Sequence, residues 1–298
     1  MDSFTPQAKH VGFIALIGRP STGKSTFINR VVGHNLAIVA ALPQSTRQRV
    51  RGILNTTDAQ LIFTDTPGIH SSEKRFNRHL LNQAKLGMEE ADVILYLVDV
   101  TRKIAEEEMA IATLLKSVSQ PVVIALNKTD KAKNFTVDYM LFFNKLFPNK
   151  EIFKISAKEN MGIHPLLHHL TSLLPVGPML YPEDIYTDQE PSLRIAEILR
   201  KHAILSLKEE IPHALYVKIE DLQMKGARLW VRVALVVERE SQKPILIGKG
   251  ASNLRKIRIA SLKELSTVFP YKIDLDIQIK VDKDWRSNEH RLSQILTP

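Results

Sequence analysis

The feature that most constrains this chain is a glycine-containing segment that directly follows a run of apolar residues. It reads Gly18-Arg19-Pro20-Ser21-Thr22-Gly23-Lys24-Ser25-Thr26 and matches the pattern G-x-x-x-x-G-K-S. The apolar run over residues 11–17 predicts a buried strand, and the helical spacing of apolar residues over 25–32 predicts a helix that ends at Gly33. In such a loop the backbone N–H groups surround a phosphate, the lysine adds positive charge, and the serine hydroxyl can bind Mg²⁺. The segment therefore predicts a phosphate-binding loop between a strand and a helix.

Further apolar runs in the first half of the chain predict a mostly parallel sheet. They cover residues 60–64, 93–98, 121–126 and 151–155, and amphipathic helical stretches separate most of them. This alternation is typical of a doubly wound α/β fold, in which ligands bind beyond the carboxyl ends of the strands. Three polar segments follow such strands: Asp65-Thr66-Pro67-Gly68-Ile69, Asn127-Lys128-Thr129-Asp130 and Ser156-Ala157-Lys158. With the phosphate loop, four strand ends are expected to meet at one ligand.

The order of these motifs resembles that of the translation-factor-type GTPases. In that superfamily the asparagine and aspartate of N-K-x-D hydrogen-bond guanine, and the lysine packs along the base. A backbone amide of the segment that corresponds to Ser156-Ala157-Lys158 contacts the guanine oxygen. The resemblance therefore implies GTP, rather than ATP, as the nucleotide.

The polar segment 44–49 resembles the first switch of the same superfamily, where a threonine completes the coordination of Mg²⁺. The resemblance gives this role to Thr46, with Ser45 as the alternative. The predicted metal ligands are then Ser25, Thr46 and Asp65, and the predicted catalytic residues are Lys24, Thr46, Asp65 and Gly68. Ile69 stands where small signalling GTPases carry the glutamine that orients the attacking water, so we expect slow intrinsic hydrolysis.

The second half of the chain predicts a separate α+β module. Residues 174–184 contain three prolines and a glycine, which predicts a stiff, extended linker, and we place a first domain at 1–176, the linker at 177–190 and a second domain at 191–298. Helical spacing over 193–207 and 253–268, with strand patterns over 214–220, 229–237 and 273–281, gives the order α-β-β-α-β.

A basic segment leads into the second of these helices. Residues 243–263 contain six Lys or Arg and no Asp or Glu, and a basic glycine-containing turn before a helix suits a nucleic-acid backbone. The segment resembles the KH domain, whose G-x-x-G loop binds single-stranded RNA, although Ala251 replaces the last glycine. The candidate RNA-binding residues are Gly248, Lys249, Gly250, Ala251, Asn253, Arg255, Lys256 and Arg258.

The combination of these motifs resembles one family, the Era GTPases of bacteria. A GTPase domain with Gln44-Ser45-Thr46-Arg47 in the first switch and Asp65-Thr66-Pro67-Gly68-Ile69-His70 in the second precedes a carboxy-terminal KH domain. The resemblance implies GTP and GDP as substrate and product, Mg²⁺ as cofactor, and binding to the 3′ region of small-subunit 16S ribosomal RNA to assist maturation of that subunit. It further implies a cytoplasmic protein with peripheral association at the inner membrane, and we expect a monomer.

Composition bears on the partner and excludes some kinds of site. The formal charge of +9 favours a polyanionic partner, RNA or a membrane surface, and the absence of cysteine excludes disulfides and thiolate metal sites. No apolar run approaches the roughly 18 residues of a membrane span. His164 and His168 have metal-ligand spacing without an acidic residue close by in sequence, so we assign no metal there.

Two other classes of function compete with the GTPase hypothesis. One is a non-catalytic RNA-binding assembly factor with a vestigial nucleotide site, against which the intact Lys24, Ser25, Asp65 and Asp130 argue. The other is a metabolic P-loop kinase, against which residues 127–130 and the basic second domain argue.

Overall fold

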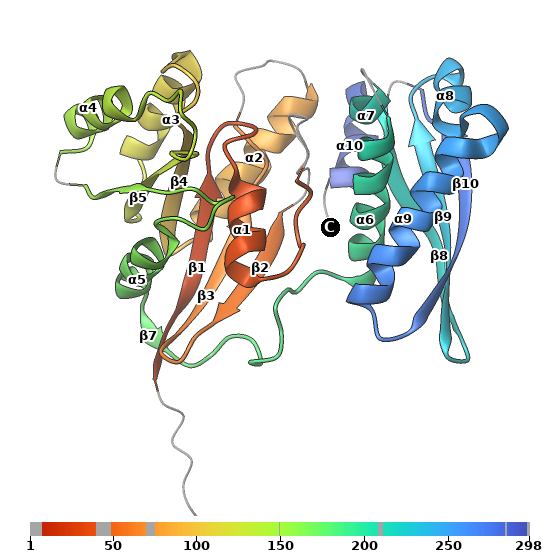
Figure 1. Cartoon of the computed structure of the whole chain (residues 1–298), viewed down its shortest axis with the longest axis horizontal. Coiled ribbons are helices and arrows are strands. Elements are labelled where there is room, and N and C mark those ends of the chain that lie inside the picture. The colour runs from red at the N-terminus through yellow and green to blue at the C-terminus, as the bar shows by residue number, and fades with distance from the viewer. Residues whose placement is uncertain are drawn as a thin grey trace, which may run out of the picture. The chain divides into compact units, whose positions relative to one another are not determined.

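The chain folds into two compact units. The structure is a computed structural model that describes residues 8–39, 49–69, 75–148, 150–207, 211–283 and 285–296. One unit comprises Met1–Glu73 and Asn77–Asp188, and the other comprises Gln189–Pro298 together with Lys74–Phe76 (Figure 1). The first is the predicted doubly wound α/β fold and the second is the predicted α+β module, so the fold class is confirmed.

The first unit is built on a seven-stranded, mostly parallel sheet in the order β2-β3-β1-β4-β5-β6. The strands are β1 (Lys9–Ile17), β2 (Val50–Asn55), β3 (Ala59–Asp65), β4 (Val93–Asp99), β5 (Val122–Asn127), β6 (Ile152–Lys154) and β7 (Val176–Gly177). Strands β3, β1, β4, β5 and β6 are parallel, whereas β2 is antiparallel to β3 and β7 is antiparallel to β1. The carboxyl ends of the parallel strands therefore share one edge of the sheet.

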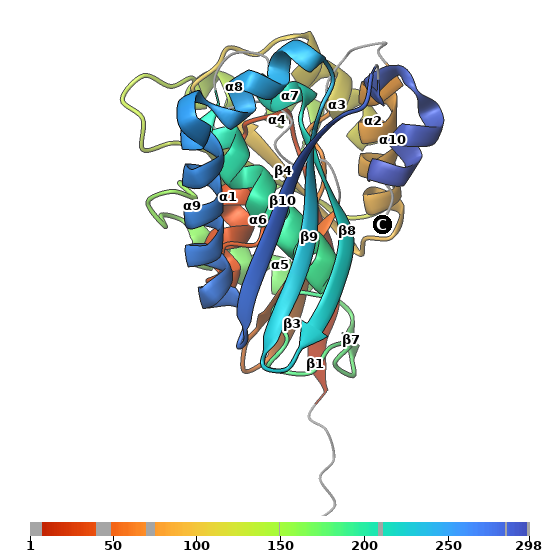
Figure 2. The same cartoon turned by 90° about the vertical axis from the view of Figure 1, so that its right-hand side faces the viewer.

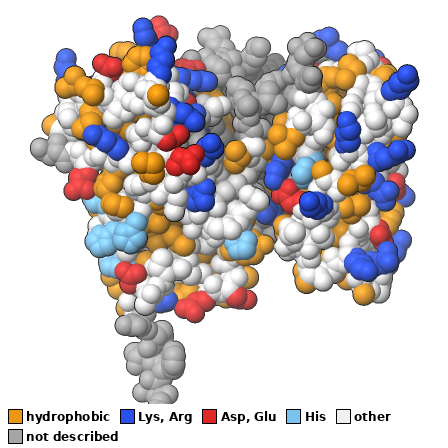
Figure 3. Space-filling view, viewed as in Figure 1, with side chains coloured by type: hydrophobic (Ala, Val, Ile, Leu, Met, Phe, Trp, Pro, Cys, Tyr) orange, Lys and Arg blue, Asp and Glu red, His pale blue; other side chains and the backbone are white. Residues whose placement is uncertain are grey.

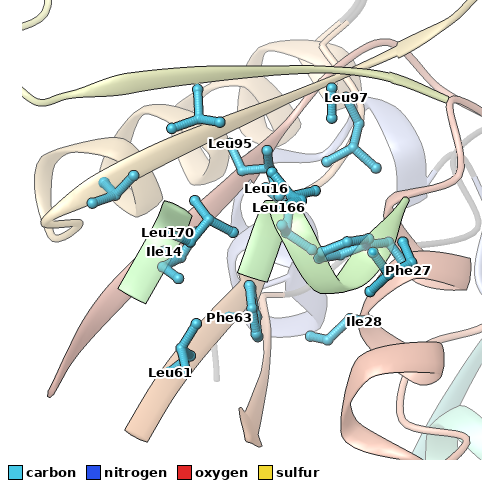
Figure 4. Packing of buried hydrophobic residues seen from close by; sticks show 14 of the residues in the cluster. Ile14, Leu16, Phe27, Ile28, Leu61, Phe63, Leu95, Leu97, Leu166 and Leu170 are labelled. Carbon is cyan, nitrogen blue, oxygen red and sulfur yellow. The ribbon is translucent and has the colours of Figure 1, made fainter. Parts of the chain in front are cut away.

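Helices cover both faces of this sheet. They are α1 (Lys24–Val32), α2 (Arg75–Glu89), α3 (Glu106–Lys116), α4 (Thr136–Leu146) and α5 (Ile163–Leu173). The cluster under α1 and α5 includes Ile14, Phe27, Phe63, Leu166 and Leu170 (Figure 4). The cluster under α3 and α4 includes Ile17, Ile111, Tyr139 and Phe143. Burial on both faces explains why the strands read as unbroken apolar runs.

The second unit packs helices on a three-stranded sheet. Its elements are α6 (Pro191–Ser206), α7 (Ile211–Ala214), β8 (Tyr216–Lys225), β9 (Arg228–Val237), α8 (Lys243–Ile247), α9 (Ser252–Val268), β10 (Lys272–Val281) and α10 (Glu289–Leu296). Strand β9 lies in the middle, antiparallel to β8 and parallel to β10 (Figure 2). The predicted order α-β-β-α-β holds for α6, β8, β9, α9 and β10. Helices α7, α8 and α10 were not predicted, because such short helices show little periodicity.

The helical face of that sheet forms the core of the second unit. Its buried residues include Ile195, Leu199, Val231, Leu265 and Leu275. Across the ranges that the structure describes, no helix of either unit is long and apolar enough to cross a bilayer.

The segment that follows β7 packs against the first unit through the side chain of Gln60. This glutamine is fully buried in β3, and its Oε1 accepts the N–H groups of Leu180 and Tyr181 at 2.8 and 3.0 Å. Its Nε2 donates to the carbonyl of Tyr181 at 2.8 Å. One buried amide therefore fixes the first part of the segment that we predicted as a linker.

The rest of that segment runs beside β2, which is the outermost strand on one side of the sheet. The Ile53 N–H donates to the Tyr186 carbonyl at 2.9 Å, and the Thr187 hydroxyl donates to the Arg51 carbonyl at 2.7 Å. These contacts hold the chain on the first unit as far as Thr187.

Candidate functional site

The phosphate loop between β1 and α1 holds its lysine inside the protein. Lys24 is 5% exposed, and its Nζ donates to the carbonyls of Gly18 and Arg19 at 3.0 Å each. Burial lowers the pKa of Lys24 to about 8, although the nearby Asp65 carboxylate acts in the opposite direction. The loop is closed further by the Thr22 hydroxyl, which donates to the Arg19 carbonyl at 3.1 Å.

This lowered pKa predicts how nucleotide affinity depends on pH. The charged form of lysine is the protonated form, so the free protein loses the charge that attracts phosphate as the pH rises through about 8. We expect the Kd for GDP to rise about tenfold between pH 7 and pH 9 because only about one Lys24 in ten stays protonated at pH 9. Fluorescent-GDP titrations would measure this. Lys24→Arg is the control: arginine keeps its charge, so an equally steep rise in that variant would contradict the assignment.

The phosphate loop directly contacts the predicted guanine motif. The Asn127 Nδ2 donates to the Thr22 carbonyl at 2.8 Å. Gly23 has a φ of 100°, and a Cβ added there would lie 2.3 Å from the same Nδ2 atom. A side chain at this position would therefore push the two motifs apart.

The structure brings two of the predicted metal ligands together. The Ser25 hydroxyl donates to the Asp65 carboxylate at 2.8 Å, and Asp65 is fully buried at the end of β3. A hydroxyl beside a carboxylate fits Mg²⁺, which takes hard oxygen ligands and commonly keeps one or two protein ligands besides phosphate oxygens and water. Thr46, the third predicted ligand, lies outside the described residues, as do its alternative Ser45 and the rest of the segment 40–48.

The segment after Asp65 lies against the phosphate loop. A Cβ added to Gly68 would lie 2.6 Å from the backbone nitrogen of Pro20, and the Ile69 N–H donates to the Gly18 carbonyl at 3.1 Å. The Ile69 side chain packs on the cluster under α3 and α4. An apolar side chain held in this way has no group that could orient a water molecule.

A carboxylate that we did not predict fixes the lysine of the guanine motif. The Lys128 Nζ donates to Asp99 Oδ2 at 2.7 Å and to the Ser21 carbonyl at 2.8 Å. Although burial acts in the opposite direction, hydrogen bonds from Lys128 and Thr101 hold the pKa of Asp99 below its ordinary value. Its position as the last residue of an apolar strand was the signal in the sequence.

The last two motifs are joined to each other. A hydrogen bond from the Ser156 side chain holds the pKa of Asp130 below its ordinary value. The Ala157 N–H donates to Asn127 Oδ1 at 2.9 Å, and the Thr129 hydroxyl donates to the Ile155 carbonyl at 2.9 Å. The structure therefore brings all four predicted strand-end segments into one network.

A buried ion pair that we did not predict lies behind the phosphate loop. The Arg19 guanidinium pairs with Glu108 of α3, and the two residues are 3% and 0% exposed. The Arg19 Nη1 also lies 3.8 Å from Glu107 Oε2. Arg19 was predicted to bind the cofactor, and its carbonyl does lie in the loop, but its guanidinium is held in the protein interior.

In the second unit, the basic turn before α9 has an unusual backbone. Gly248, Gly250 and Ala251 have φ values of 75°, 57° and 60°, all in the left-handed region. The side chains of Lys249, Arg255, Lys256 and Arg258 are exposed, and Lys and Arg side chains are visible on this unit in Figure 3. The Asn253 amide, which we predicted to bind RNA, donates to the Ile245 carbonyl at 2.8 Å and so ties α9 to α8.

Ala251 adopts a conformation that suits glycine, so Ala251→Gly tests the strain in this turn. A left-handed alanine costs roughly 1 kcal/mol, and we expect the variant to keep or raise the free energy of unfolding of the second unit by up to about 1 kcal/mol. Urea unfolding followed by tryptophan fluorescence would measure it. Ala260→Gly, inside α9, is the matched control and should lose about 0.5–1 kcal/mol. An equal loss in both variants would show that the turn is unstrained.

Comparison with known proteins first defines the class. A sequence model of the family described as "50S ribosome-binding GTPase" matches residues 13–128, and one described as "KH domain" matches residues 210–286. The chain is therefore a GTPase with a carboxy-terminal KH domain.

The relatives of the whole chain define the family. GTPase Era of Treponema denticola is 49% identical over 290 residues, which cover 95% of this chain and 98% of that protein. GTPase Era of Treponema pallidum (strain Nichols) is 42% identical over 308 residues, covering 96% and 97%. The chain belongs to the Era family of GTPases.

Solved structures agree with this family. An Era variant of Aquifex aeolicus bound to GDP and AlF4⁻ superposes with a TM-score of 0.91 at 32% identity, over 97% of this chain and 99% of that one. A structure of Era in complex with MgGDPNP and nucleotides 1506–1542 of 16S ribosomal RNA gives a TM-score of 0.92 at 32% identity, with the same coverage.

Proposed function

We propose that this chain is a GTP-hydrolysing switch that binds the 3′ region of 16S ribosomal RNA through its KH domain and assists maturation of the small ribosomal subunit. The observation that carries the nucleotide part is the network of four strand-end segments, in which the phosphate loop contacts Asn127 and the Ser25 hydroxyl contacts Asp65. The solved relative bound to 16S RNA supports the RNA part.

In the proposed reaction a water molecule attacks the γ-phosphate of GTP in line with the leaving GDP. Lys24 supplies positive charge to the phosphates, and the Gly68 N–H would contact the γ-phosphate. Ser25 and Asp65 would hold Mg²⁺, which neutralises charge that develops on the phosphate oxygens when it is bound. Asn127 and Asp130 would hydrogen-bond guanine, and the stem of Lys128 would flank the base.

The proposed target is the small ribosomal subunit, whereas the description of the matched GTPase family names the 50S ribosome. That description covers residues 13–128 and so does not include the KH domain. The exposed Lys249, Arg255, Lys256 and Arg258 flank the turn that would bind the RNA backbone. The proposal also includes that the protein is a cytoplasmic monomer that associates peripherally with the inner membrane. The charge of +9 supports the association with an anionic membrane surface.

The decisive experiment measures GTP hydrolysis at fixed salt with and without single-stranded RNA that matches the 3′ end of 16S ribosomal RNA. We expect stimulation by this RNA and none by an unrelated RNA of equal length. The double variant Arg255→Ala/Lys256→Ala should lose the stimulation. Lys218→Ala/Lys272→Ala, which removes two exposed charges from the sheet of the same unit, should keep it.

If neither RNA changed the rate of GTP hydrolysis while the protein still bound GTP, the proposed coupling between the two domains would be contradicted. Equal stimulation by both RNAs would contradict the proposed RNA target. If GTP strengthens RNA binding, linkage requires that RNA strengthen GTP binding by the same factor, which nucleotide titrations with and without RNA would measure.

A further inference from the structure

Arg30 lies in the last turn of α1 and belongs to none of the motifs identified above. Its Nη2 donates to the Lys158 carbonyl at 2.7 Å, and its Nε donates to the Ala157 carbonyl at 3.3 Å. A planar guanidinium with several fixed N–H donors can span two successive carbonyls, which a lysine ammonium cannot do in the same geometry. Arg30 therefore holds the backbone of the segment that we assign to guanine binding.

The same segment is fixed from its other side. The Ala157 N–H donates to Asn127 Oδ1 at 2.9 Å, and Ser156 and Met161 form two backbone hydrogen bonds with each other at 3.0 Å each. In a trans peptide the N–H points away from the C=O. Because the Ala157 carbonyl points to Arg30, the Lys158 N–H of the same peptide points away from α1. Arg30 thus sets the direction of a backbone donor in the guanine-binding segment.

Arg30 also connects this segment to the phosphate loop. Helix α1 starts at Lys24, beside Ser25, and a helix rises about 1.5 Å per residue, so Arg30 lies about 9 Å further along the same rigid element. The helix therefore sets the distance between the phosphate site and the base site.

From these contacts we propose that Arg30 is a positioning residue for guanine selectivity. It orients the backbone N–H of Lys158 toward the base oxygen, so that a base with an amino group at that position meets another donor and is rejected. The inference rests on the guanine-binding role proposed above and adds the residue that maintains its geometry.

The test compares three nucleotides on the full-length protein. IDP keeps the base oxygen but lacks the 2-amino group, whereas 2-aminoadenosine diphosphate keeps the 2-amino group but carries an amino group in place of the oxygen and no hydrogen on N1. In Arg30→Ala we expect the ratio of the Kd for 2-aminoadenosine diphosphate to the Kd for GDP to fall about 3- to 10-fold. The IDP-to-GDP ratio should stay as in the wild type.

Control variants separate positioning from a general loss of structure. In Arg30→Lys the ratio of the Kd for 2-aminoadenosine diphosphate to the Kd for GDP should lie between the values of Arg30→Ala and the wild type. Lys116→Ala, which removes an exposed positive charge in the last turn of α3, should leave both ratios unchanged. If Arg30 had a merely structural role, Arg30→Ala would lower the affinity for all three nucleotides by the same factor and leave both ratios unchanged. That result would overturn the inference. If the wild-type protein bound 2-aminoadenosine diphosphate as tightly as GDP, the proposed recognition of guanine itself would be refuted.

Discussion

Replacing Glu108 with alanine is expected to lower the free energy of unfolding of the first unit by about 3–5 kcal/mol, because it leaves a buried charge without its partner. Glu108 is fully buried and pairs with the Arg19 guanidinium, which is 3% exposed. Burial raises the pKa of Glu108 to about 7, while Arg19 acts in the opposite direction. The experiment therefore belongs at pH 8, where the carboxylate is mostly ionised.

Hydrogen exchange of peptides from β1 and β4 would measure this effect in the first unit. Both tryptophans of the chain, Trp230 and Trp285, lie in the second unit, so the urea midpoint of their fluorescence serves as an internal control and should not move. Glu107→Ala is the matched variant. Its carboxylate is 27% exposed and 3.8 Å from Arg19, so its loss should cost no more than about 1 kcal/mol. Equal effects of the two variants would show that the buried pair has no special role.

Asp130→Asn is expected to weaken GDP binding about 30- to 5,000-fold and to make XDP the preferred nucleotide. The carboxylate would accept hydrogen bonds from the base, and removing one partner of a charged, desolvated pair costs about 2–5 kcal/mol. An asparagine presents an N–H₂ donor, which opposes the amino group of guanine and suits the carbonyl that xanthine carries there. Kd values for GDP and XDP with both proteins would measure the change.

Asp138→Asn is the control for this prediction, because it makes the same chemical change at an exposed position of α4. It should leave both Kd values as in the wild type. If Asp130→Asn lowered the affinity for GDP and XDP by the same factor, the carboxylate would support the fold of the site rather than read the base.

The sequence predicted the parts of the site whose signal is local. The phosphate loop, Asp65, Asn127 and Asp130 each follow an apolar strand, and a parallel sheet brings such ends to one edge whatever the details of packing. The same reasoning gave the order of the main elements in the second unit. The role of Thr46 stays a prediction, because that residue lies outside the described part of the chain.

What the sequence did not predict depends on partners that are distant along the chain. Arg30 contacts Lys158 across 128 positions, and Asp99 contacts Lys128 across 29. Glu108 is one of three successive glutamates at the start of α3, where acidic residues are ordinarily favoured by the helix dipole, so nothing local marked it as buried. Side-chain partners of this kind follow from packing, which periodicity does not encode.

The segment that runs beside β2 has a consequence for where the first domain can be cut. A strand at the end of a sheet offers unpaired N–H and C=O groups to strands of other molecules, which promotes aggregation. Here the Ile53 N–H and the Arg51 carbonyl are already occupied by Tyr186 and Thr187. A fragment that stops at residue 176, where the sequence suggested a boundary, would expose this edge, whereas one that continues to Asp188 would retain its own cover.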